Sequence, residues 1–142
     1  MLREAVHCRG HENVRATHKS TLEFTKEDHL TPRGDCILCV GADKGINDLS
    51  EEFKAALKAG KKLLIRIKVG NLVEEIIAEG SPDLILDHDC SMVVRKSTYI
   101  DGRTLAVRAN KAARDISRRV VELLKNPETV AEIELIISEE KP

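Results

Sequence analysis

The chain has 142 residues, 42% of them apolar and 33% charged, and its 23 basic side chains nearly balance its 24 acidic ones. That length and apolar content suit one folded domain, residues 1–142, with a core of its own. A net charge of −1 and an aromatic content of 2% argue against nucleic acid as a partner, because nucleic-acid binding draws on a basic surface and on aromatic stacking.

The composition also bears on the compartment of the protein. No apolar run approaches the roughly 20 residues of a membrane span, and the N-terminus lacks the apolar segment of a signal peptide. We therefore expect a cytoplasmic protein without membrane contact, whose four cysteines are reduced, buried thiols. Frequent Lys and Glu with few Asn and Gln are typical of thermophile surfaces, and an intracellular disulfide is an exception known from such organisms.

The first half of the chain contains strand signals around one helix signal. Weaker strand signals cover residues 4–8, 13–18 and 36–41. The segment 49–59 reads as a helix, with Asp48 as N-cap, Glu51 at the capping-box position and Gly60 after its end. The clearest strand follows at residues 62–69, where apolar residues alternate with Lys and Arg.

The second half begins with weaker strand signals at residues 72–78 and 84–87. Two alternating runs then flank Asp101-Gly102, which predicts a β-hairpin. Apolar residues at helical spacing predict a second helix over 111–125, and residues 129–138 read as a last strand.

Together these elements predict a mainly β or α+β fold. About eight strands would form a sandwich-like sheet, with the helices 49–59 and 111–125 on its flank. We find no internal repeat and no linker in the sequence.

A polar row stands out in the segment 18–25. If this segment is a strand, Lys19, Thr21, Glu23 and Thr25 share one face. A buried row of this kind must be hydrogen-bonded throughout, and such networks are often retained for function. On an exposed face the same row is ordinary sheet surface.

The leading hypothesis is a binding module for a small anionic or phosphorylated ligand. Arg108 and Lys111 lie at the start of the second predicted helix, where free amides and the helix dipole attract anions. The "TPRGD" turn would add Arg33 and backbone amides, although a tight turn alone explains its Pro and Gly. The hypothesis requires Arg33 and Lys111 to face a common pocket. The predicted ligand-binding residues are Thr21, Thr25, Arg33, Gly34, Arg108 and Lys111.

The alternative is an acid/base or metal-assisted hydrolytic enzyme. Its candidate catalytic residues are His18, Glu23 and Asp35, with His88 and Asp87 as substitutes. It requires a histidine within hydrogen-bond reach of a carboxylate in a cleft. A third hypothesis is a structural or interaction protein, with RNA the least favoured partner; a homo-oligomer is left open.

No cofactor is predicted, and the metal-site signals are weak. Cys36 and Cys39 lie in a strand-like run, where residues three apart face opposite sides of a sheet and do not chelate one ion. Asp87, His88 and Asp89 place two carboxylates two residues apart, which suits a divalent cation and equally suits a polar turn.

Two blocks, "HENVRATHKSTLEFT...LTPRGDCI" and "DGRTLAVRANKAARDISRRVVELL", resemble the small archaeal proteins of the domain-of-unknown-function family number 371. The resemblance spans essentially the whole chain and implies an archaeal, predominantly β protein of sandwich type with no established activity. Cys39 stands where the family often has glycine, and Asn110 where it has aspartate. The matching positions are His11, Asn13, His18, Thr21, Glu23, Thr25, Arg33, Gly34, Asp35, Cys36, Arg108, Lys111 and Ala112.

Overall fold

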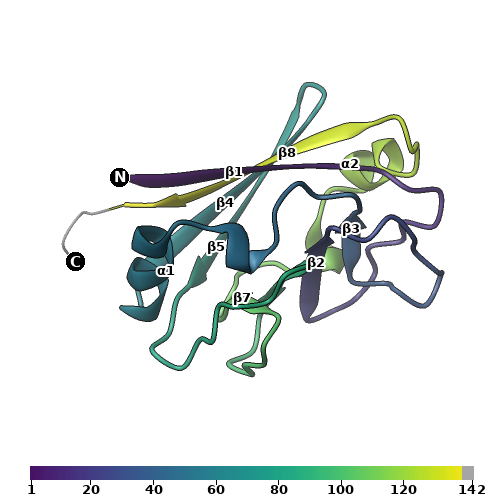
Figure 1. The fold of residues 1–142 in the computed structure, drawn as a ribbon. Helices are drawn as coiled ribbons and strands as arrows, with labels where there is room; N and C mark the ends of the chain where they lie inside the picture. The colour runs from purple at the N-terminus through teal and green to yellow at the C-terminus, as the bar shows by residue number, and fades with distance from the viewer. Residues whose placement is uncertain (139–142) are drawn as a thin grey trace.

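The computed structural model describes residues 1–138, which form eight strands, two α-helices and two short 3-10 helices (Figure 1). The predicted mainly β fold with two flanking helices is therefore confirmed. None of the helices in this described part has the length and apolar character needed to cross a membrane. The elements are β1 (Leu2–Arg9), β2 (Thr21–Thr25), β3 (Ile37–Cys39), η1 (Ile46–Asp48), α1 (Glu51–Lys58), β4 (Lys62–Val69), β5 (Leu72–Glu79), β6 (Ser91–Arg95), β7 (Thr104–Ala106), η2 (Ala113–Asp115), α2 (Arg118–Leu123) and β8 (Val130–Ile137).

The strands form two four-stranded sheets. One has the order β1-β8-β4-β5 and is antiparallel throughout; the other has the order β3-β2-β6-β7, with an antiparallel centre and parallel outer pairs. Isolated bridges from Arg9 to Val40 and from Glu79 to Val107 join the sheets at both edges. Strand pairing therefore continues around the whole molecule and encloses one core.

The long strands β4 and β8 supply the centre of that core because their apolar residues alternate with polar ones. Their inward side chains are fully buried, and the outward side chains of β4 include Arg66 and Lys68. The inward residues are Leu63, Ile65, Ile67, Val69, Ala131, Ile133, Leu135 and Ile137.

The second half of the chain repeats the first, element by element. Each half runs through three strands, a 3-10 helix, an α-helix and a fourth strand. Each sheet is centred on an antiparallel pair of equivalent strands, β4 with β8 and β2 with β6, which is the arrangement of an approximate twofold axis. No repeat was expected from the sequence, because the halves keep only scattered identical residues.

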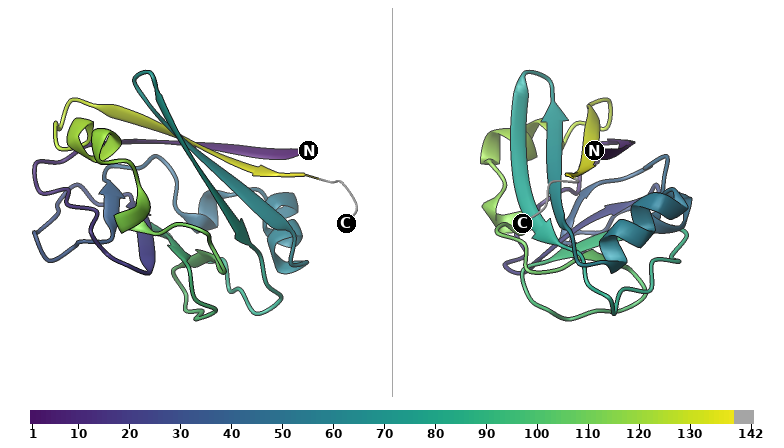
Figure 2. Two further views of the ribbon diagram at one scale, coloured as in Figure 1. Left: turned by 180° about the vertical axis from the view of Figure 1, so that it is seen from behind. Right: turned by 90° about the vertical axis from the view of Figure 1, so that its left-hand side faces the viewer.

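Each half is fastened to the helix of the other half by a glycine. Gly10 follows β1 and packs on the end of α2, while Gly80 follows β5 and packs on the end of α1. A Cβ at Gly10 would collide with the carbonyl oxygen of Leu124, and one at Gly80 with that of Leu57. The two helices lie at opposite ends of the molecule, as Figure 1 and the left view of Figure 2 show.

Three strand predictions are wrong. Residues 13–18 and 84–87 are irregular segments that precede β2 and β6, and each turns through a residue of positive φ, Ala16 at 48° and Leu86 at 59°. The hairpin at Asp101-Gly102 is also absent, since β6 and β7 pair in parallel.

Both helices are shorter than predicted. Ser50, not Asp48, is the N-cap of α1, and its hydroxyl accepts the amide of Phe53. Residues 111–125 do not form one helix, because the 3-10 helix η2 comes first and α2 begins only after the N-cap Ser117.

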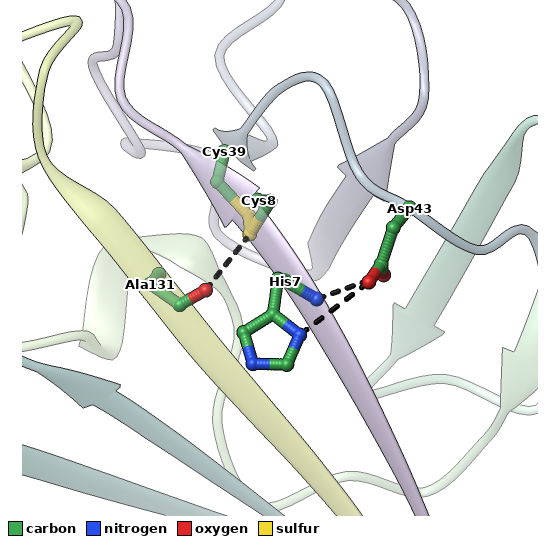
Figure 3. The surroundings of a disulfide bond; sticks show 5 residues. All are labelled: His7, Cys8, Cys39, Asp43 and Ala131. Atoms are coloured by element: carbon green, nitrogen blue, oxygen red, sulfur yellow. Dashed lines mark hydrogen bonds and ion pairs between the residues drawn. A yellow bond between two sulfur atoms is a disulfide. The ribbon is translucent and has the colours of Figure 1, made fainter.

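The expectation of four reduced cysteines is wrong for two of them. Cys8 on β1 and Cys39 on β3 form a disulfide across the seam between the two sheets (Figure 3). Cys36 and Cys90 are free thiols. In the second half the equivalent seam positions are Ala78 and Ala106, so only the first half carries this covalent link.

Candidate functional site

The predicted polar row lies on β2, in the middle of the sheet with the shorter strands. Because β2 pairs with β3 on one side and β6 on the other, its side chains have neighbours on both flanks. Glu23 is only 6% exposed and Thr25 only 2%, while Thr21 is half-buried and Lys19 is exposed ahead of the strand. The row is therefore buried from Glu23 onward, which is the case that requires polar partners.

Glu23 is the least ordinary member of the row, since a glutamate is rarely buried to this depth unless it is paired. Its Oε2 accepts a hydrogen bond of 3.0 Å from the Ser91 hydroxyl. Its Oε1 accepts a hydrogen bond from the Cys36 thiol at 3.6 Å, an ordinary distance for a sulfur donor, and forms an ion pair with the Arg103 guanidinium at 3.7 Å. A carboxylate has about four acceptor positions, and these three partners leave room for a further donor.

Cys36 acts as a donor to Glu23 and is unsuited to nucleophilic catalysis. Burial, and then the charge of Glu23, raise the pKa of the Cys36 thiol to about 12. The group therefore stays protonated at neutral pH, whereas a nucleophilic cysteine needs a thiolate.

A cavity of about 160 Å³ opens beside Glu23. Its wall combines Glu23 and Thr25 from β2 with Gly34 from the "TPRGD" turn and Ile37 from β3. Glu27 and His29 stand at the exposed rim, where His29 Nε2 lies 3.2 Å from Glu27 Oε2. An engineered apolar cavity of about 150 Å³ holds benzene, so a small organic group fits a space of this size.

Three of the predicted site residues line this cavity: Glu23, Thr25 and Gly34. The backbone carbonyl of Asp35 accepts the amides of Thr17 and His18, which ties the turn to the loop before β2. Arg33 is exposed beside Gly34 but does not line the cavity.

The structure places Lys111 and Arg108 away from the cavity. Lys111 pairs with Glu74 at 3.4 Å, and the other oxygen of Glu74 accepts the Ser117 amide at the start of α2. Glu74 thus occupies the position predicted for an anionic ligand. Arg108 is exposed and has a φ of 52°, in a connecting segment ahead of η2.

The histidines predicted as bases have structural roles. His18 Nδ1 accepts the amides of Ser20 and Thr21, and His88 Nδ1 accepts the equivalent amides of Cys90 and Ser91. Neither ring pairs with a carboxylate within residues 1–138. Thr21 contributes to this loop through its amide.

The candidate metal ligands do not converge. Asp89 accepts a hydrogen bond from the side-chain amide of Asn47, and His88 turns its Nδ1 to the backbone. Over the described residues, no group of three or more His, Cys, Asp or Glu side chains is placed to hold a metal ion.

Several residues of the site were not predicted from the sequence, among them Glu27, His29, Ser91 and Arg103. Glu27 and His29 belong to a polar connecting segment with no motif. Ser91 and Arg103 come from the second half, and Ser91 reaches Glu23 because β6 pairs with β2 in the register Thr25 to Ser91.

The sequence also matches known proteins. A family model described as a domain of unknown function, DUF371, matches residues 6–138. An uncharacterized protein of the archaeon Methanocaldococcus jannaschii is 53% identical over 120 residues, which cover 84% of this chain and 89% of that protein. Both findings agree with the resemblance seen in the two sequence blocks, and neither description names a ligand or a reaction.

Proposed function

We propose that this chain, which belongs to the family described as a domain of unknown function (DUF371), binds a small molecule in the cavity beside Glu23. The single observation that carries the proposal is Glu23 itself, a buried glutamate at a cavity wall whose cationic partner Arg103 lies as far as 3.7 Å away. A buried charge is costly unless it is closely paired, and a bound ligand supplies a closer partner than Arg103 at 3.7 Å.

The wall chemistry indicates the kind of ligand. Glu23 and Glu27 contribute negative charge, and the Thr25 hydroxyl already accepts the amide of Glu27. Such a wall accepts hydrogen bonds, so it suits a ligand that donates them. A phosphate or carboxylate is the less suitable occupant here, because it would face two carboxylates.

The test is a binding screen on the intact chain, with the Ile37 and Leu30 methyl groups as NMR reporters, since both residues line the cavity. Acetate, inorganic phosphate, urea, ethylammonium and ethylguanidinium are added one at a time at millimolar concentrations. We expect at least one of the three donor-bearing probes to shift these methyl signals.

Two variants make the screen specific. Glu23→Gln keeps the size of the side chain and removes its charge, so it should weaken the response, whereas Glu12→Gln, at an exposed residue outside the cavity, should not. No response to any probe, or a response to phosphate alone, would overturn the proposal.

A second candidate is an acid/base enzyme, which the contact between His29 Nε2 and Glu27 Oε2 favours. This pair supplies the histidine and carboxylate that the sequence hypothesis assigned to other residues, and it stands at a cavity. Hydrolysis of a chromogenic ester or phosphomonoester, lost in His29→Gln and retained in His11→Gln, would support it. Equal rates for wild type and His29→Gln would refute it.

A further inference from the structure

The internal repeat contains a second version of the cavity. Thr25 at the end of β2 corresponds to Arg95 at the end of β6, and Ile37 on β3 corresponds to Thr104 on β7. Gly34 corresponds to Asp101, because the amide of Ile37 bonds to the Gly34 carbonyl as that of Thr104 bonds to the Asp101 carbonyl.

In the second half the cavity is filled by an arginine of the chain itself. The Arg95 guanidinium donates to the Thr104 hydroxyl and to an Asp101 carboxylate oxygen, each at 3.0 Å. Tyr99 stacks on it with the guanidinium carbon 4.9 Å from the ring centre. The Arg95 side chain is only 12% exposed, so this guanidinium is enclosed.

In the first half the same space is open because Thr25 is short. The cavity lies among Thr25, Gly34 and Ile37, the positions that Arg95 and its two partners Asp101 and Thr104 hold in the second half. The acid of the second half, Asp101, has no counterpart at Gly34, but Glu23 replaces the apolar Val93 and Glu27 stands at the rim. The first half therefore lacks the internal arginine and has carboxylates in its place.

We infer that the cavity binds a guanidinium group, in the place that Arg95 fills in the second half. This inference rests on the proposed small-molecule function and names its ligand class. A guanidinium has five donors in a planar fork that matches a carboxylate, whereas an ammonium is a more strongly hydrated point charge. Glu23 supplies the main acceptor and Glu27 the second.

The positive charge of Arg103 beside Glu23 affects how tightly a guanidinium ligand binds. Its guanidinium lies 3.7 Å from Glu23 Oε1 and does not line the cavity, so it lowers the negative potential without occupying the space. Removing this charge in Arg103→Gln should therefore tighten the binding of a guanidinium ligand.

The test compares ethylguanidinium with ethylammonium and urea by NMR titration of the Ile37 and Leu30 methyl signals. Urea has nearly the same shape without the charge, and ethylammonium has the charge without the fork. We expect millimolar binding of ethylguanidinium, since so few atoms give limited affinity, and binding at least tenfold weaker in Glu23→Gln. N-acetylarginine amide and a peptide with an internal arginine distinguish a free small molecule from a protein side chain as the natural source.

The variant Thr25→Arg supplies the ligand from within. It restores the residue of the second half, so the new side chain should fill the cavity, raise the melting temperature and abolish ethylguanidinium binding. Thr21→Arg, on the same strand but outside the cavity, is the matched control.

The outcomes separate the inference from the proposed function. If ethylguanidinium binds no more tightly than ethylammonium and urea while one of them shifts the methyl signals, the ligand class is wrong and the cavity still binds a ligand. If no probe shifts these signals in the wild type, the proposed function fails as well.

Discussion

Removal of the Cys8–Cys39 disulfide tests how much this bond stabilises the fold that contains the cavity. The bond closes a segment with a sequence separation of 31, and this segment contains β2, the "TPRGD" turn and every residue that lines the cavity. If a disulfide acts by restricting the unfolded chain, the loop-closure entropy for a segment of this length corresponds to about 3.7 kcal/mol of stability. For a chain of this size that is a fall of about 10 °C in melting temperature.

The double variant Cys8→Ala/Cys39→Ala removes the disulfide with side chains that fit the same position. The second half already has Ala78 and Ala106 at the same seam, so alanine is a side chain that this backbone accommodates. We expect urea denaturation to show a loss of about 3–4 kcal/mol for the variant. Wild type treated with reductant should show a similar loss, and reductant should not change the variant.

The result that would refute this reasoning is a loss below about 1 kcal/mol in both samples, because it would mean that the unfolded chain gains little freedom when the link is broken. A response of the variant to reductant would show that Cys36 or Cys90 takes part in another bond.

Three further predictions concern packing, a buried charge and acid. Gly80→Ala should lower the free energy of unfolding by about 2–3 kcal/mol in urea denaturation, because its Cβ would collide with the Leu57 carbonyl, while Gly102→Ala, with open space around it, should have little effect. Glu134→Ala should lower the free energy of unfolding by about 1–3 kcal/mol in the same measurement. The Glu134 carboxylate is only 2% exposed and lies 2.8 Å from Lys68, and the loss stays moderate because its cationic partners are in contact with water. An equal loss for Glu132→Ala, at a more exposed residue, would contradict this. Hydrogen bonds from Lys96 and from the Ala112 amide lower the pKa of Asp115, so the unfolded chain binds a proton at this residue more readily than the folded chain. The stability that Asp115 contributes is therefore present above about pH 4 and is lost as pH falls through its folded pKa. Melting temperatures measured between about pH 5 and pH 2 should fall less steeply for Asp115→Asn than for wild type.

The long strands could be predicted from the sequence, and the irregular loops could not. In β4 and β8 one face is wholly buried, so apolar and polar residues alternate along the sequence as buried and outward side chains alternate along the strand. Residues 14–16 and 84–86 also alternate buried with exposed side chains, yet Ala16 and Leu86 have positive φ and belong to loops. Alternation reports which side chains are buried and not how the backbone reaches them.

The same distinction applies to the site. Glu23, Thr25 and Gly34 could be recognised because they are neighbours on one strand or in one turn. Ser91 and the Cys8–Cys39 pair depend on which strands lie side by side, and residues far apart in sequence determine that. The Asp101-Gly102 turn is a real turn, but its strands pair in parallel, a choice that turn residues do not encode.

Some equivalent positions of the two halves carry the same residue and hold the fold, and others differ and line the cavity in the first half. Where both halves keep the same residue, the residue holds the fold: Lys44 and Lys111 each bind a glutamate, Glu4 or Glu74, that also caps a helix start through the amide of Ser50 or Ser117. Two of the positions at which the halves differ in chemistry line the cavity, where Glu23 stands against Val93 and Thr25 against Arg95.

A repeat used only for stability would not need this difference, because the filled version with Arg95 is already satisfied. In place of the Arg95 ion pair the first half has Thr25 and the buried carboxylate of Glu23, and a buried carboxylate without a close cationic partner costs stability in the empty protein. A ligand that pairs with Glu23 restores that stability when it binds. The reverse substitution tests this: Thr25→Arg should make the ligand-free protein more stable, and an unchanged or lower melting temperature in a correctly folded Thr25→Arg would show that the open cavity carries no such cost.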